Sequence, residues 1–257
     1  MEQVVDHIVS WLNSYSENSG TKGFVVGVSG GIDSAVTSYL CALTGKPTIC
    51  VEMSIHQAES QENRASLHID ALQEKFPHVS RENMDLTSTY DHIRGILPSY
   101  DNDDLALVNT RARLRMTTLY YIATSKGMLV AGTGNKVEDF GIGFYTKYGD
   151  GGVDLSPIAD LTKTEVYSVA KALGVISQIQ IAPPTDGLWG DDRTDEDQIG
   201  ASYPELEWAM EKYDAGESAE SFEGRQLEVF QIYAKLHKAN QHKMLPIPVC
   251  EIPDRIK

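Results

Sequence analysis

The stretch Ser29-Gly30-Gly31-Ile32-Asp33-Ser34 decides the fold that we expect for this chain. An apolar run, Phe24-Val25-Val26-Gly27-Val28, precedes it, and Ala35-Val36-Thr37-Ser38-Tyr39-Leu40 follows it with apolar residues at helical spacing. A short run rich in Val and Phe is typical of a strand that is buried on both faces of a parallel sheet. The pattern therefore predicts a strand, a glycine turn and a helix, which is the opening unit of an α/β fold.

The chemistry of this turn favours a phosphate group. Glycines let the backbone approach a ligand closely, and the free N–H groups at the start of a helix point towards an anion. The hydroxyls of Ser29 and Ser34 add donors, and Asp33 can hold a divalent cation bound to the same anion. The alternative is an ordinary glycine–serine turn that caps a helix. The loop lacks the Gly-Lys-Ser/Thr end of a Walker loop and the third glycine of a dinucleotide fingerprint, so neither is predicted.

Composition narrows the functional class. The chain has 257 residues, 41% of them hydrophobic and 23% charged, and its formal net charge is −15. Such a surface repels nucleic-acid backbones, so no nucleic-acid partner is expected. The acidic start has no signal-peptide pattern, and no apolar run reaches membrane-spanning length, so no membrane partner is expected either. The three cysteines (Cys41, Cys50 and Cys250) lack metal-ligand spacing, which indicates reduced thiols and a cytoplasmic protein.

Strands and helices are expected to alternate along the first two thirds of the chain. Strands are predicted at 24–28, 47–53, 79–84 and 128–132, and helices at 2–17, 35–45, 60–76, 86–97, 105–126, 162–173, 203–213 and 222–240. The fold class is thus a doubly wound parallel sheet of about five strands flanked by helices, with a helical C-terminal part. Ligands of such sheets bind beyond the carboxyl ends of the strands, where both glycine turns fall. The long polar loops at 141–153 and 183–197 are expected to be functional.

A second glycine turn, Gly132-Thr133-Gly134-Asn135, closes the fourth predicted strand. Thr133 could bond a nucleotide, and Glu138 follows one helical turn later. With Asp33, Glu138 would complete a pair of carboxylates for Mg²⁺. The alternative for this turn is a simple helix N-cap.

Three arginines, Arg111, Arg113 and Arg115, alternate along the long predicted helix. Alternate positions on a helix lie about 200° apart, so the three side chains cannot share one face. At most one or two of them should point into a site, and the others are expected in surface ion pairs.

Several segments together resemble a known family. The first loop resembles the signature of the ATP-pyrophosphatase (PP-loop) group. Four further segments are similar in order and spacing to bacterial NH₃-dependent NAD synthetases: 112–116 (Ala-Arg-Leu-Arg-Met), 144–151 (Phe-Tyr-Thr-Lys-Tyr-Gly-Asp-Gly), 161–163 (Leu-Thr-Lys) and 242–243 (His-Lys). The resemblance covers roughly residues 23–245, and the Lys-Tyr-Gly-Asp-Gly stretch is its most specific part.

The resemblance implies a ligase that amidates deamido-NAD to NAD with free ammonia. The acid is adenylated by ATP, which goes to AMP and pyrophosphate, and Mg²⁺ is the metal. The resemblance also implies a homodimer. It implies three sets of residues: for ATP, Gly27, Ser29, Gly30, Gly31, Asp33, Ser34, Thr133, Lys163 and Thr185; for deamido-NAD, Arg113, Lys147, Asp154, His242 and Lys243; and for the metal, Asp33 and Glu138. Asp33, Lys163 and Asp154 are the expected catalytic residues, and either Asp150 or Asp154 could hold ammonium.

The expected organisation is a single domain over residues 1–257. Its α/β core would cover about residues 20–180, and its C-terminal helices and substrate loops about residues 181–257. Nothing before Phe24 could house an amidase, so free ammonia is the expected nitrogen source, with a separate glutaminase partner as an alternative.

Family members often have Arg where this chain has Glu52. Another PP-loop amide-forming ligase, similar to a GMP or asparagine synthetase, is the alternative activity.

Overall fold

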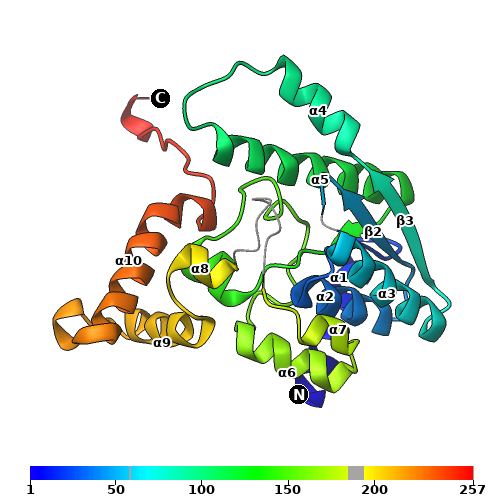
Figure 1. The fold of residues 1–257 in the computed structure, drawn as a ribbon, viewed down its shortest axis with the longest axis horizontal. Coiled ribbons are helices and arrows are strands. Elements are labelled where there is room, and N and C mark those ends of the chain that lie inside the picture. Colours follow the sequence, from blue (N-terminus) through cyan, green and yellow to red (C-terminus); the bar gives the residue numbers. More distant parts are fainter. Residues whose placement is uncertain (58, 185–193, 257) are drawn as a thin grey trace.

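A computed structural model describes residues 1–57, 59–184 and 194–256 of the chain (Figure 1). In chain order its elements are α1 (Glu2–Asn18), β1 (Phe24–Gly27), α2 (Ile32–Leu43), β2 (Thr48–Ser54), α3 (Glu59–Lys75), β3 (Val79–Asp85), α4 (Thr87–Ile96), α5 (Asp104–Lys126), β4 (Leu129–Val130), the π-helix η1 (Lys136–Ile142), α6 (Lys163–Leu173), α7 (Ser177–Gln180), α8 (Asp195–Ile199), α9 (Tyr203–Asp214), the 3₁₀ turn η2 (Ala219–Ser221), α10 (Gly224–Met244) and the 3₁₀ turn η3 (Asp254–Ile256).

The strands form a parallel sheet in the order β3-β2-β1-β4. Strand β1 lies in the middle, where Phe24 pairs with Thr48 on one side and with Leu129 on the other. The chain winds outwards from β1 in both directions, so the phosphate-type loop after β1 lies where the strand order reverses. Ligands of open α/β sheets bind at this position.

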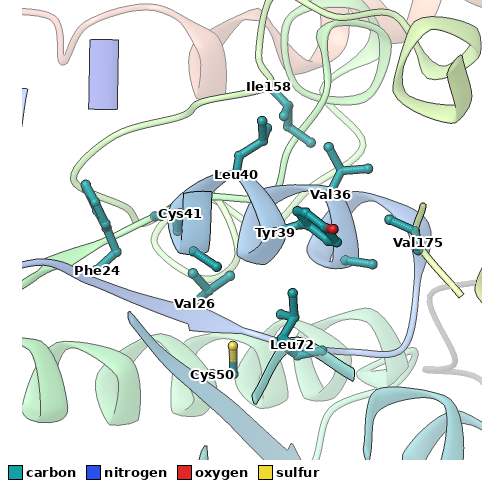
Figure 2. Packing of buried hydrophobic residues seen from close by; sticks show 14 of the residues in the cluster. Phe24, Val26, Val36, Tyr39, Leu40, Cys41, Cys50, Leu72, Ile158 and Val175 are labelled. Carbon is teal, nitrogen blue, oxygen red and sulfur yellow. The ribbon is translucent and has the colours of Figure 1, made fainter. Parts of the chain in front are cut away.

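Helices cover both faces of the sheet, as its apolar strands predict. On one face Phe24 and Val26 of β1 pack against Val36 and Leu40 of α2, and α1, α3 and α6 extend the same cluster (Figure 2). On the other face Val25 packs with residues of α5. Because successive residues of a strand point to opposite sides, a doubly covered strand has apolar residues at every position.

The C-terminal helices α9 and α10 form a second core beside the sheet (Figure 1). Leu206 and Tyr233 are fully buried there, and Val137 and Ile142 of η1 pack into the same cluster. The π-helix η1 therefore connects the C-terminal helices to the end of β4. This junction brings the carboxyl end of the sheet close to the C-terminal part of the chain.

The structure confirms the α/β class and corrects three details. The described residues form four strands, not about five. After the short β4, pairing continues only as a parallel bridge between Ala131 and Leu155. The fourth strand covers Leu129–Val130 rather than 128–132, because the glycine turn diverts the backbone. Four residues of α7 were missed, since a single turn has too few positions to show a period. No described helix is long and apolar enough to cross a membrane.

Candidate active site

The loop between β1 and α2 has the geometry that phosphate binding requires. Gly30 has φ +81°, and a side chain there would meet the carbonyl oxygen of Gln61 at 2.6 Å. Ser34 Oγ donates to the carbonyl of Gly31 at 3.0 Å and accepts from the backbone N–H of Ser29 at 3.2 Å. The N-cap of α2 is Gly31, which offers no side chain to its first amides. These amides therefore remain available to an anion.

Three charged side chains meet above this loop. Lys163 Nζ lies 2.6 Å from Asp33 Oδ2 and 2.9 Å from Glu138 Oε1. The three residues come from α2, η1 and the first turn of α6. Helix α6 begins with a capping box of Thr162 and Glu165, which holds the backbone of Lys163. The structure thus brings together three residues that the sequence assigned to ATP and the metal.

Asn135 orients Asp33 and Glu138 through hydrogen bonds of its side chain. Its side-chain amide donates to Asp33 Oδ1 at 3.1 Å, and its Oδ1 accepts from the backbone N–H groups of Val137 and Glu138. The N-cap alternative for the second glycine turn is therefore correct for Asn135 itself. The same cap also orients Glu138 towards the first loop.

Burial and charge act against each other in this cluster. Burial and, to a smaller extent, the charge of Glu138 raise the pKa of Asp33, whereas Lys163 lowers it, and the net pKa is raised. Burial also acts to raise the pKa of Glu138, but Lys163 and the hydrogen bond from Tyr203 outweigh it and the net pKa is lowered. For Lys163 burial alone lowers the pKa, yet the two carboxylates raise it above the ordinary value. The ammonium is thus firmly protonated although its side chain is only 3% exposed.

Tyr203 is a member of this cluster that the sequence did not indicate. Its hydroxyl donates to Glu138 Oε1, and Lys163 Nζ lies 4.8 Å from the centre of its ring. Tyr203 is the first residue of α9, in the predicted C-terminal part. A tyrosine at a helix start carries no local signal of function, so only the packing of α9 against α6 and η1 could reveal it.

A cavity of about 810 Å³ opens beside the cluster. Residues predicted for ATP line it: Gly27, Ser29, Gly30, Gly31, Asp33, Ser34, Thr133 and Lys163. Glu138 and Lys243 line it as well. Its walls come from the ends of the strands, from α5 and from the 143–153 loop. Its size suits a nucleotide together with a second substrate.

Four residues predicted for the acid substrate lie around the Lys147 loop. Lys243 Nζ donates to the carbonyls of Gly143 and Tyr145, each at 2.8 Å. Lys147 Nζ donates to the carbonyl of His242 at 2.6 Å, and Arg113 donates to the carbonyl of Lys147 at 3.3 Å. These four residues thus form one group around the Lys-Tyr-Gly-Asp-Gly loop. Of the four, only Lys243 lines the cavity, and His242 and Arg113 are exposed.

Asp154, another predicted residue, lies outside the cavity lining. The carboxylate of Asp154 accepts from the backbone N–H of Val130 at 2.8 Å and from the hydroxyl of Tyr120 at 3.0 Å. Asp154 therefore ties the loop to β4 within this chain. Thr185 lies outside the described residues.

The three arginines of α5 do not share one face, as their spacing predicts. The guanidinium of Arg111 lies 5.0 Å from the ring centre of Tyr90. Arg113 contacts the Lys147 loop, whereas Arg115 lines the cavity and donates to the carbonyl of Met53 and to Gln57 Oε1. Burial and the nearby Arg111 lower the pKa of Arg115 to about 10. The arginine that faces the cavity is thus Arg115, which the sequence did not select.

Glu52, where the family often has Arg, forms an ion pair with the neighbouring strand. Its Oε2 lies 3.3 Å from Arg81 Nε, and its Oε1 accepts from Ser66 Oγ at 2.6 Å. Arg81 comes from β3. Strand β3 therefore places the guanidinium of Arg81 beside Glu52, the position where family members often have Arg.

The model of the NAD synthase family matches residues 4–246. The chain belongs to this family. It is 34% identical to the NH₃-dependent NAD⁺ synthetase of Methanocaldococcus jannaschii, over 98% of both chains. It also resembles an NMN synthetase from Francisella tularensis, with a TM-score of 0.84 and 29% identity over 98% of each chain. The NH₃-dependent NAD synthetase of Campylobacter jejuni shares the fold, with a TM-score of 0.78 and 22% identity over 97% of this chain and 99% of that one.

The donor set of this family member fits Mg²⁺ bound together with a phosphate. The described residues contain no group of three or more His, Cys, Asp or Glu side chains that could enclose a metal. They do contain the pair Asp33 and Glu138 beside the loop amides. Mg²⁺ is commonly bound by one or two carboxylates, with substrate phosphates and water completing its octahedral shell. Two carboxylates at the edge of a phosphate site are sufficient for that arrangement.

Proposed function

We propose that this chain amidates deamido-NAD with free ammonia, while ATP goes to AMP and pyrophosphate. The observation that carries the proposal is the contact of Lys163 with both Asp33 and Glu138 above the glycine loop. Membership of the NAD synthase family supplies the substrate class. The reaction is the closing amidation of NAD biosynthesis and belongs to the carbon–nitrogen ligases that form AMP.

Residues of the first loop bind the phosphates of ATP. Gly27, Ser29, Gly30, Gly31 and Ser34 provide backbone and hydroxyl donors, and Thr133 and Thr185 contact the nucleotide. A carboxylate of the acid substrate is a poor electrophile until its oxygen attacks the α-phosphorus. Bond formation there expels pyrophosphate and leaves AMP on the carboxyl carbon as a good leaving group. The loop amides and Lys163 stabilise the charge that builds on the phosphates.

Asp33 and Glu138 are the residues that would hold Mg²⁺. When bound, the ion supplies a positive charge that neutralises the pyrophosphate leaving group. Asn135 and Tyr203 keep the two carboxylates oriented through the hydrogen bonds described above. Since Tyr203 belongs to the C-terminal helices, the site supports the proposal that residues 1–257 act as one domain.

Basic and polar side chains around the Lys147 loop bind the dinucleotide. Arg113, Lys147, His242 and Lys243 contact its anionic groups, and Asp154 orients the loop that carries Lys147. Ammonia then attacks the adenylated carbonyl and expels AMP, and of the two aspartates Asp150, which lines the cavity, is the one placed to hold ammonium. Several of these groups face the surface, which supports a homodimer in which a second subunit completes the site. The free thiols Cys41, Cys50 and Cys250 support the cytoplasm as its location.

An end-point assay tests the proposal directly. Purified protein with ATP, Mg²⁺, deamido-NAD and ammonium is expected to yield NAD, AMP and pyrophosphate in equal amounts. Formation of ADP and phosphate would overturn it. Amidation of another acid in place of deamido-NAD would favour a GMP- or asparagine-synthetase-like ligase.

The likeness to an NMN synthetase favours one second candidate. The acid would then be the mononucleotide, the deamido form of NMN, and the adenylate half of deamido-NAD would have no site. Comparing kcat/KM for the two acids separates the candidates, because each predicts a preference of at least about tenfold for its own substrate. We expect deamido-NAD to be preferred, since the curated relatives such as that of Alkaliphilus metalliredigens, 35% identical over 95% of this chain, are NAD synthetases.

A further inference from the structure

The ammonium of Lys163 occupies the space between the two carboxylates assigned to the metal. Its Nζ lies within 2.9 Å of an oxygen from each, Asp33 Oδ2 and Glu138 Oε1. The ring of Tyr203 lies against the ammonium, and the Tyr203 hydroxyl donates to the same Glu138 oxygen. The side chain of Lys163 is 3% exposed, so the protein itself supplies almost its whole environment.

A magnesium ion on the same two oxygens would need the same space. Mg²⁺ binds oxygen at about 2.0–2.1 Å. An ion at that distance from both Asp33 Oδ2 and Glu138 Oε1 would lie between them, where Nζ lies now. Two cations cannot share this position, because their repulsion in a buried site is large. Occupation by Lys163 and occupation by Mg²⁺ thus exclude each other.

Metal binding without nucleotide would also leave Lys163 poorly compensated. Moved off the two carboxylates, the buried ammonium would lose both of its ion-pair partners, Asp33 and Glu138. A buried charge without a counter-ion is strongly unfavourable. The phosphates of ATP remove this penalty, because they offer Lys163 new anionic partners beside the glycine loop. The backbone of Lys163 can stay fixed by its capping box while the flexible four-carbon side chain turns.

We propose that Lys163 is the resident cation of the metal site in the free protein and that Mg²⁺ enters only together with ATP, as Lys163 moves from the carboxylates to the phosphates. This inference rests on the proposed function for the identity of the nucleotide. It assigns Lys163 two successive positions. It also predicts that metal and nucleotide bind as a unit.

Manganese binding to the nucleotide-free protein tests the exclusion. Mn²⁺ is the probe, and its free fraction is followed by electron paramagnetic resonance. Lys163→Met, which keeps length and removes charge, is expected to bind Mn²⁺ at least tenfold more tightly than the wild-type chain. Equal affinities would overturn the proposal.

Two variants control this comparison. Lys136 lies on the same π-helix as Glu138 and forms an ion pair with Asp160 near the surface. Lys136→Met removes this ammonium and is expected to leave Mn²⁺ binding unchanged. The double variant Lys163→Met/Glu138→Gln keeps one carboxylate and is expected to lose the gain in affinity. A gain of the same size in either control would also overturn the proposal. The effect would then not depend on removing Lys163 from a complete pair of carboxylates.

The wild-type chain gives a test that does not depend on the folding of any variant. With ¹⁵N-labelled lysine, the Nζ resonance of Lys163 is expected to shift on addition of Mg²⁺ with α,β-methylene-ATP, and to stay in place with Mg²⁺ alone. A shift with Mg²⁺ alone, or none with both, would overturn the exchange. Neither measurement involves the acid substrate or ammonia, so a failure to form NAD would refute the proposed function without deciding this inference.

Discussion

Two groups of charged residues hold their charges in different ways: the group at the glycine loop, called the ATP end after its proposed ligand, and the group around the Lys147 loop, called the acid end for the same reason. At the ATP end, Lys163 pairs with both Asp33 and Glu138, so that opposite charges meet within the chain. At the acid end, Lys147 and Lys243 donate to backbone carbonyls instead. Within the described residues, neither of these two ammonium groups has a carboxylate at ion-pair distance. A neutral carbonyl orients an ammonium without neutralising it, and Asp150 and Asp139 act on Lys243 only from beyond ion-pair distance.

This difference indicates how each end meets its substrate. At the ATP end the ammonium of Lys163 is already paired with two carboxylates before ATP binds, so binding has to exchange partners. The acid end carries oriented positive charge, which an anionic dinucleotide can neutralise without displacing any side chain. Substitutions at the ATP end should therefore lower the catalytic rate. Substitutions at the acid end should lower the affinity for the acid substrate.

The largest effect is expected at Asp33. Asp33→Asn removes a metal carboxylate and a partner of Lys163 while keeping the shape of the side chain. We expect AMP formation to fall by about 10³-fold, the scale of losing a preorganised electrostatic contact in an active site. The matched control is Asp160→Asn in an exposed ion pair, which should retain full activity. Near-normal AMP formation by Asp33→Asn, with an unchanged circular dichroism spectrum, would contradict the metal assignment.

A smaller effect is expected from Lys243. Lys243→Met removes a charge-assisted contact and should raise KM for deamido-NAD by about ten- to a hundredfold while KM for ATP stays unchanged. Initial-rate measurements with each substrate varied in turn give both constants. Lys238→Met, on the exposed face of the same helix, serves as the control. If KM for ATP rose instead, the division between the two ends would be wrong.

Tyr203→Phe is expected to lower kcat by about tenfold. It deletes the hydrogen bond to Glu138 but keeps the ring beside Lys163, so the loss corresponds to one hydrogen bond to a charged group. Tyr213→Phe, on the same helix but outside the cluster, should have no effect on kcat. Unchanged kcat in Tyr203→Phe would show that Asn135 and Lys163 suffice to orient Glu138.

The smallest effect on activity at neutral pH is expected at His68, a buried residue of α3 that contacts α2. Its Nε2 lies 2.9 Å from Ser38 Oγ of α2, and burial lowers its pKa to about 4. The unfolded chain binds this proton near pH 6.5 and the folded chain does not, so stability is lost as pH falls from about 6.5 towards 4. We expect a loss of about 2 kcal/mol between pH 7 and pH 5 from this group.

Urea unfolding at the two pH values measures this loss. His68→Gln should reduce the pH dependence, whereas His92→Gln on the exposed face of α4 should not. If both variants kept the full dependence, another group would be responsible.

Much of the fold follows from local patterns. The Val-rich run before Ser29 predicts a doubly covered strand, and Thr162 with Glu165 predicts the start of α6. Prediction was weaker where signals are short. The fourth strand has only two residues, and the four-residue α7 cannot show a period. The π-helix at Lys136–Ile142 also follows no local rule, because its backbone is decided by packing against α9 and α10.

The sequence by itself predicted the glycine loop and the carboxylate pair Asp33 and Glu138, since their chemistry is local, and the family resemblance pointed to Lys163. Only the tertiary structure decided that Lys163 lies between both carboxylates, 130 residues from Asp33 along the chain. It also decided that Tyr203 joins them, that Arg115 faces the cavity, and that Asp154 faces away from it. The physical reason is that a motif constrains a few neighbouring residues, whereas the meeting of distant side chains depends on how whole helices pack.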